Sequence, residues 1–146
     1  MKAIIAATAL MIFAFACGPK HADNYNKKNE ITTLWTQIRG WRLEAGLPVE
    51  PRHEDVISVI GTPVKDVQRV CPEGHNVPQT CSDVCSLAEA ICDNAESICT
   101  LADELGKDDS WAQDKCSSAK ASCRDAKKKC CGCSEKAEKA AKAAPL

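Results

Sequence analysis

The sequence predicts an all-α protein built on a disulfide-stapled antiparallel helical hairpin, and three observations predict it. Cysteines recur every seven residues in two sets, which are Cys85, Cys92, Cys99 and Cys116, Cys123, Cys130. Alanines recur at the same spacing beside them, a set that we call the alanine row: Ala88, Ala95, Ala102, Ala112, Ala119 and Ala126. Finally, no proline interrupts residues 80–105 or 110–133, and a glycine lies between these segments.

Helix geometry predicts from this spacing which cysteines pair. Seven residues are about two helical turns, so residues at this spacing share one face. If the chain reverses between Lys107 and Asp108, cysteines at equal distances from the turn face each other. A disulfide holds Cα atoms about 5.5–6 Å apart, so we expect unusually close helices, which the alanine row permits. The predicted bridges are Cys85–Cys130, Cys92–Cys123 and Cys99–Cys116.

Apart from Cys17 at the start of the chain, four cysteines remain outside these three bridges. Cys81 and Cys133 continue the alanine row, so we expect them to pair. Cys71–Cys131 then follows by elimination and would tie the middle of the chain to the end of the hairpin. The alternative for these four residues is Cys131–Cys133 together with Cys71–Cys81. The bridges have a structural role, because a small domain with a thin core needs cross-links.

The ends and charges of the two hairpin helices, about 80–105 and 109–133, support the hairpin. Thr80 or Ser82 can cap the first helix, and Gly106 is typical of a helix end. Ser110 with Gln113 resembles a capping box at the start of the second helix. The charged residues of the first helix, from Asp83 to Glu104, are all acidic, and those of the second are mostly lysine and arginine. We therefore expect ion pairs between the two helices.

An amphipathic helix at about 29–45 precedes the hairpin. Its apolar residues follow the helical period and are Ile31, Leu34, Trp35, Ile38 and Trp41. The first hairpin helix carries a second apolar stripe: Val84, Leu87, Ile91, Ile98, Leu101 and Leu105. We expect the amphipathic helix to pack on this apolar groove. The alternative is that the stripe binds a partner.

The remaining segments of the single Cys-rich domain, residues 30–133, are less regular. Prolines and glycines divide residues 47–79, where we expect a short helix starting near His53 and a loop at 71–78. Residues 134–146 form a charged tail of alanine, lysine and glutamate, for which we expect no core contacts.

The start of the chain has the features of an export signal. Lys2 precedes a short apolar run, and Ala14-Phe15-Ala16 satisfies the small-x-small cleavage rule, which predicts a signal peptide over residues 1–16. Cys17 follows directly and resembles the lipid-carrying cysteine in the lipobox of bacterial lipoproteins. This resemblance implies a lipid on Cys17 and attachment to a membrane of the bacterial envelope. The polar composition of the following residues predicts a flexible tether over residues 17–29. Removing Cys17 from the 11 cysteines leaves an even number.

Composition and motifs exclude several classes of function. A net charge of −1 gives no electrostatic reason to bind nucleic acid. We find no catalytic constellation and no cofactor motif, and we expect His21, His53 and His75 to be solvated. Thiolates along a helical bundle resemble the bacterial copper-storage proteins, so copper(I) binding is the alternative. Cysteines about 10.5 Å apart on one helix cannot share an ion, however, and exported cysteines meet oxidising conditions.

Two further resemblances concern the hairpin. Disulfide-bridged antiparallel helices are similar to the coiled-coil-helix proteins of the mitochondrial intermembrane space, although their cysteine spacing differs. Residues 91–99, Trp111-Ala112, Lys115-Cys116 and the Cys130-Cys131-Gly132-Cys133 ending resemble uncharacterised Cys-rich lipoproteins of myxobacteria. Neither resemblance implies an activity. We therefore expect a non-enzymatic, membrane-tethered structural or interaction module of the bacterial envelope, with an envelope protein as its partner.

Overall fold

The computed structural model describes residues 19–72 and 74–143, with side chains from His21 onward. The described residues form helices and connecting segments, and none of them lies in a strand. The helices are α1 (Pro19–Glu44), α2 (His53–Ile57), α3 (Val64–Val67), α4 (Ser82–Leu105) and α5 (Ser110–Ala143), and a short 3-10 helix, η1 (Gln79–Cys81), precedes α4. The predicted all-α fold is confirmed.

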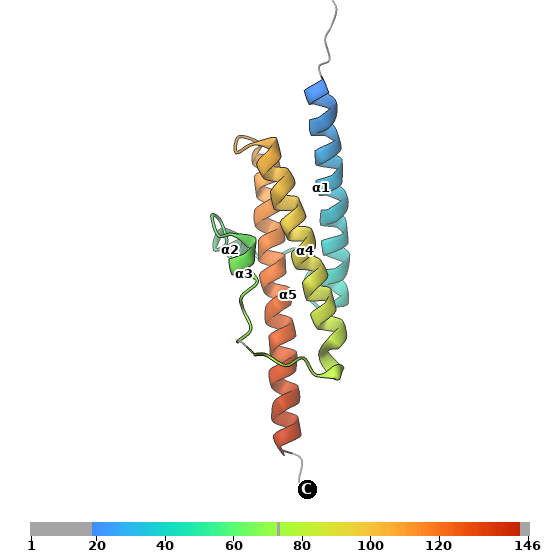
Figure 1. Cartoon of the computed structure of the whole chain (residues 1–146), viewed down its shortest axis with the longest axis vertical. Coiled ribbons are helices and arrows are strands. Elements are labelled where there is room, and N and C mark those ends of the chain that lie inside the picture. The colour runs from blue at the N-terminus through green and yellow to red at the C-terminus, as the bar shows by residue number, and fades with distance from the viewer. Residues whose placement is uncertain (1–18, 73, 144–146) are drawn as a thin grey trace, which may run out of the picture.

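The two predicted hairpin helices correspond to α4 and α5, which run antiparallel to each other. Helix α1 runs along this hairpin (Figure 1). Helix α4 ends at Leu105 because Gly106 takes a φ of 103°, which an L side chain would not tolerate well. Figure 1 shows α2 and α3 on the opposite side of the hairpin from α1. The N-terminal end of α1 and the hairpin turn lie at one end of the molecule, and α5 reaches the other end.

Helix α1 packs on the apolar stripe of α4, as predicted from the sequence. Ile91 and Ile98 of α4 are fully buried and belong to one hydrophobic core with Ile31, Trp35 and Ile38 of α1. Within this contact, Asn94 Nδ2 donates hydrogen bonds to the Leu34 carbonyl, at 3.4 Å, and to Gln37 Oε1, at 2.8 Å. These polar contacts fix the register of α1 along α4.

The expectation of a flexible tether before this helix was wrong for the part that the structure describes, because α1 begins at Pro19. The extra turns are held by ion pairs, two of which join lysines of α1 to residues far away in the sequence. Lys27 Nζ lies 2.7 Å from Asp23 and 3.3 Å from Glu104. Lys28 Nζ lies 2.6 Å from Asp109 and 5.6 Å from the centre of the Trp111 ring. The hairpin turn therefore stabilises the first half of α1.

The connection between α1 and α4 is held against α5 mainly by basic side chains. Helix α2 is the short helix predicted near His53, whereas α3 was not predicted. Lys120 Nζ donates to the Thr62 carbonyl at 3.0 Å, and an Arg124 Nη donates to the Asp55 carbonyl at 3.0 Å. Of the expected ion pairs between α4 and α5, the described part of the chain forms one, between Lys127 and Glu89. Lys115 instead lies over the Trp35 ring, and Lys120 and Arg124 bind the connection.

Two details at the helix ends differ from the predictions. Helix α4 has Cys81 at its N-cap position, without a side-chain cap from Thr80 or Ser82. At α5 the cap is Asp109, whose carboxylate accepts from the Ala112 N–H at 3.2 Å. Gln113 instead donates to the Ala102 and Gly106 carbonyls, at 3.1 and 3.3 Å, and so satisfies the last turn of α4.

Helix α5 continues without a break to Ala143, and the expectation that residues 134–146 make no core contacts was wrong. Ser134 is fully buried and Ala137 packs against the core. The first turn beyond Cys133 thus belongs to the domain.

Candidate functional site

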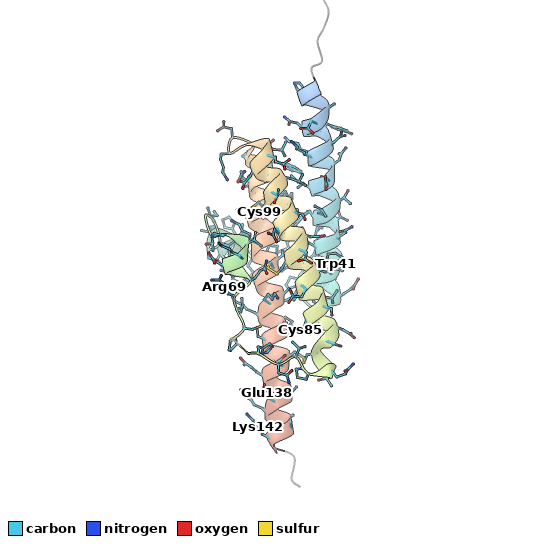
Figure 2. All side chains as sticks on the ribbon, in the orientation of Figure 1. Trp41, Arg69, Cys85, Cys99, Glu138 and Lys142 are labelled. Carbon is cyan, nitrogen blue, oxygen red and sulfur yellow. A yellow bond between two sulfur atoms is a disulfide. The ribbon has the colours of Figure 1, made fainter. Side chains whose placement is uncertain are left out.

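The most distinctive feature of the molecule is the set of five disulfides along the hairpin. Three of them, which we call the disulfide ladder, join α4 to α5 with Cα–Cα distances of 4.6 to 4.7 Å. Figure 2 labels Cys85 and Cys99, which belong to the two end rungs of this ladder. The other two bridges have Cα–Cα distances of 5.9 and 5.5 Å. The five pairs are Cys85–Cys130, Cys92–Cys123, Cys99–Cys116, Cys81–Cys133 and Cys71–Cys131.

These are the partners derived from the spacing and by elimination, and the alternative pairing of the last four cysteines is not the one in the structure. The Cα atoms of the ladder lie closer than the roughly 5.5–6 Å typical of a disulfide. With Cα atoms about 2.3 Å from each helix axis, a Cα–Cα distance of 4.6 Å places the axes at most roughly 9 Å apart. The alanine row is fully buried, so it fills the contact beside the ladder without widening it.

Six of the ten bridged cysteines gather at the end of the hairpin away from its turn, which we call the open end. Cys130 and Cys131 are neighbours in the sequence but belong to different bridges. Cys130 faces α4 through Cys85, whereas Cys131 holds Cys71 of the connection that leads into α4. Two disulfides therefore lie side by side where the connection crosses α5.

His75 also lies at the open end, and the expectation that it is solvated was wrong. The Sγ atoms of Cys71 and Cys130 and a ring nitrogen of His75 all lie within 4.8 Å of one another. His75 Nε2 is buried and has no hydrogen-bond partner among the described residues. The three residues border a hollow of about 430 Å³. His21 and His53 are exposed, as expected.

The sequence contained only a weak signal for this cluster. Cys71 and His75 are four residues apart in a loop, which is a common spacing for two ligands, but the third member comes from α5. A cluster of two sulfurs and one imidazole suits a soft metal ion. Both sulfurs are bonded in disulfides here, so thiolates for a metal would arise only after both bridges are reduced.

A second buried polar group, Arg42, joins the end of α1 to α5. Its side chain is 1% exposed. Arg42 Nε donates to the Pro48 carbonyl at 2.8 Å, and an Nη donates to Asp125 Oδ2 at 3.2 Å. Because both acceptors are satisfied by one guanidinium, Arg42 fixes the chain where it leaves α1. Sequence reasoning missed it, since a single arginine at a helix end carries no pattern.

Lys120 is a further buried polar residue and lies near the other end of the ladder. Its side chain is 7% exposed, and this burial lowers the pKa of the amine from its usual 10.5. Asp103 opposes this change and Lys107 adds to it. Lys120 borders a hollow of about 600 Å³, which also reaches Cys99 and Cys116. The amine is engaged by the Thr62 carbonyl, so its present role is to hold the connection on α5.

The predicted signal peptide, residues 1–16, and the predicted lipid site, Cys17, lie outside the described residues. Among the helices that the structure describes, none combines the length and the apolar character needed to cross a bilayer.

Comparison of the chain with protein-family models, with curated proteins and with solved structures gave no match.

Proposed function

We propose that this chain is an exported structural or interaction module of the bacterial envelope, without enzymatic activity, that is attached to a membrane by a lipid on Cys17. The observation that carries the proposal is the distribution of cysteines. All ten cysteines from Cys71 to Cys133 form bridges within the domain. Cys17 is then the one cysteine of the sequence outside this set, and it follows an export signal.

The bridges support export because disulfides form and persist in oxidising compartments. A cytosolic protein would keep such thiols reduced. A core made largely of cysteine, alanine and isoleucine is thin, and small secreted domains commonly compensate with disulfides. The similarity to disulfide-bridged coiled-coil-helix proteins and to Cys-rich myxobacterial lipoproteins favours the same interpretation.

The position of α1 gives the proposed anchor a geometric consequence. Helix α1 begins at Pro19, two residues after Cys17, and its first half lies beside the hairpin turn (Figure 1). A lipid on Cys17 would hold the turn near the membrane. Cys130 follows Asp109 by about 20 residues of helix, or roughly 30 Å, so the open end would point away from the membrane toward an envelope partner.

The proposal is tested by the intact mass of protein purified from the membranes of a bacterial host that processes lipoproteins. We expect a chain that begins at Cys17, a mass increment of lipid size, and no thiol that reacts before reduction. The matched control is Cys17→Ser, which should lack the increment and leave the membrane fraction, with the five bridges unchanged in peptide maps.

Two results would contradict the proposal. A mature chain without lipid that stays in the soluble fraction would remove the anchor. Free thiols with bound metal in the native protein would instead favour the alternative, a copper(I)-binding envelope protein. The cluster of Cys71, His75 and Cys130 is the place where such a metal would be expected, because its donor atoms are already close together.

A further inference from the structure

The hollow at the open end is bordered by cysteines of two disulfides. Cys71, Cys85 and Cys130 all border it, and they belong to two adjacent bridges, Cys71–Cys131 and Cys85–Cys130. Cys71 is half-buried, whereas its partner Cys131 is buried. Since thiol–disulfide exchange depends on access of a thiolate to a sulfur atom, Cys71 Sγ is the atom of this bridge that an external thiol can reach.

His75 supplies the hollow with a group that can exchange protons. A ring nitrogen lies within 4.8 Å of Cys71 Sγ. The buried Nε2 has no hydrogen-bond partner among the described residues. A buried polar atom without a partner costs free energy and needs an explanation. Proximity to a sulfur that must leave as a thiolate provides one, because imidazole is the side chain best suited to donate and accept protons near neutral pH.

The bridge also controls a distinct segment. Between α3 and η1, the described residues contain no helix, and their backbone hydrogen bonds are local, such as His75 N–H to the Pro72 carbonyl at 3.2 Å. Cys71–Cys131 is the covalent link from this segment to α5. Opening the bridge would therefore release the segment while the ladder keeps α4 and α5 together.

We propose that Cys71–Cys131 is a thiol–disulfide exchange site that reacts once per molecule, without turnover, with the dithiol of another protein as its substrate and His75 as the proton donor to the Cys71 thiolate. In the first step a thiolate of the substrate attacks Cys71 Sγ. The Cys71–Cys131 bond breaks, a mixed disulfide forms on Cys71, and Cys131 leaves as a thiolate that takes up a proton from water.

In the second step the other thiol of the substrate, as its thiolate, attacks the substrate sulfur of the mixed disulfide. Cys71 then leaves as a thiolate and receives its proton from His75, which water reprotonates. The substrate loses two electrons and two protons and becomes a disulfide. The bridge gains the same two electrons and two protons and becomes two thiols.

The neighbouring bridge offers the freed Cys71 a second reaction. Its thiolate lies within 4.8 Å of Cys130 Sγ, so it can attack that atom, form Cys71–Cys130 and release Cys85 as a thiolate. No electrons are gained or lost in this exchange. Free Cys131 is common to both products, and it therefore reports opening of the site in either case.

The test is stepwise reduction of the oxidised protein, with dithiothreitol as a small dithiol and thioredoxin as a protein dithiol. Free thiols are alkylated at intervals and located by peptide mapping. The matched control is Cys99–Cys116 within the same molecule, because it also has a half-buried cysteine and borders a hollow, but no histidine lines that hollow. We expect Cys131 to be labelled at least tenfold faster than Cys116 by both reagents.

The variant His75→Gln separates proton transfer from simple exposure. We expect a fall of about 10²-fold in the rate at which Cys71 is released from the mixed disulfide, which should then accumulate in intact-mass spectra. We also expect partial recovery in His75→Ala on addition of imidazole, and no change at Cys116. Equal rates for the two bridges, or an unchanged rate of Cys71 release in His75→Gln, would overturn the proposal. Opening by dithiothreitol but not by thioredoxin would overturn the assignment of a protein substrate.

This inference does not depend on the lipid anchor. Loss of the anchor would change which compartment supplies the dithiol, whereas equal reduction rates would remove the exchange site and leave the anchored module intact.

Discussion

Replacement of Arg42 by methionine tests whether a single buried guanidinium joins α1 to the hairpin. Methionine keeps most of the length of the arginine stem, so little cavity results. The substitution removes the hydrogen bond to the Pro48 carbonyl and the ion pair with Asp125, whose side chain is 17% exposed. Both hydrogen bonds are donated by a charged guanidinium, and a hydrogen bond of a charged group contributes about 1.5–3 kcal/mol. Removing one partner of a buried ion pair costs about 3–5 kcal/mol, and we therefore expect a loss of about 3–5 kcal/mol in the free energy of unfolding.

The matched control is Arg39→Met, one turn earlier on the same helix. Arg39 pairs with Glu50 at 2.9 Å, but the two side chains are 46% and 55% exposed. An exposed pair contributes about 0–1 kcal/mol, so the control should lose less than about 1 kcal/mol. A double variant, Arg42→Met with Asp125→Leu, should be more stable than Arg42→Met alone, because it leaves no carboxylate without its partner.

The assay is guanidinium unfolding of the oxidised proteins, followed by circular dichroism. The bridges remain closed in both states, so their contribution cancels between variants. A shift of the midpoint at unchanged slope measures the stability change directly. If Arg42→Met and Arg39→Met lose the same free energy within about 0.5 kcal/mol, the buried ion pair does not join the two parts, and the reasoning fails.

Three further predictions concern the ladder, the alanine row and Lys120. Removing the middle rung with Cys92→Ala and Cys123→Ala should lower the free energy of unfolding by about 2–3 kcal/mol. This is less than the roughly 3.7 kcal/mol expected for a disulfide that closes an isolated 31-residue loop, because the flanking rungs already restrain both ends. An unchanged unfolding midpoint would contradict this prediction. Ala95→Leu should cost about 1–3 kcal/mol by overpacking the buried row, whereas Ala90→Leu, half-buried on the same helix, should cost less than half as much in the same unfolding assay. Burial lowers the pKa of Lys120 in the folded protein, so between that lowered pKa and 10.5 the unfolded chain binds more protons and stability rises with pH. The difference in free energy of unfolding between wild type and Lys120→Met should therefore rise with pH across this range. A difference that does not change with pH would refute the prediction.

The sequence was sufficient for the hairpin, for α1 as a packing partner and for the bridge partners, and the reason is periodicity. A cysteine every seven residues in two segments admits one antiparallel register in which all three rungs close. Cys81–Cys133 and Cys71–Cys131 then followed because few cysteines remained. The apolar period of residues 31–41 needed a face to cover, and α4 offered a stripe of matching length.

Only the tertiary structure decided the features that bear on chemistry. The extra turns of α1 depend on Lys27 and Lys28 meeting Glu104 and Asp109, which are about 80 residues away, so no local pattern predicts them. His75 lies in a loop, and its position beside Cys130 follows from the path that the Cys71 bridge imposes.

Arg42 and Lys120 are buried although their residue types are usually exposed. Each is held by a carbonyl of the irregular connection, Pro48 or Thr62. Periodic positions are determined by helix geometry, which the sequence displays directly. Contacts between a helix and an irregular segment depend on where the folded chain places that segment, and this is why the sequence predicted the scaffold but not the cluster at its open end.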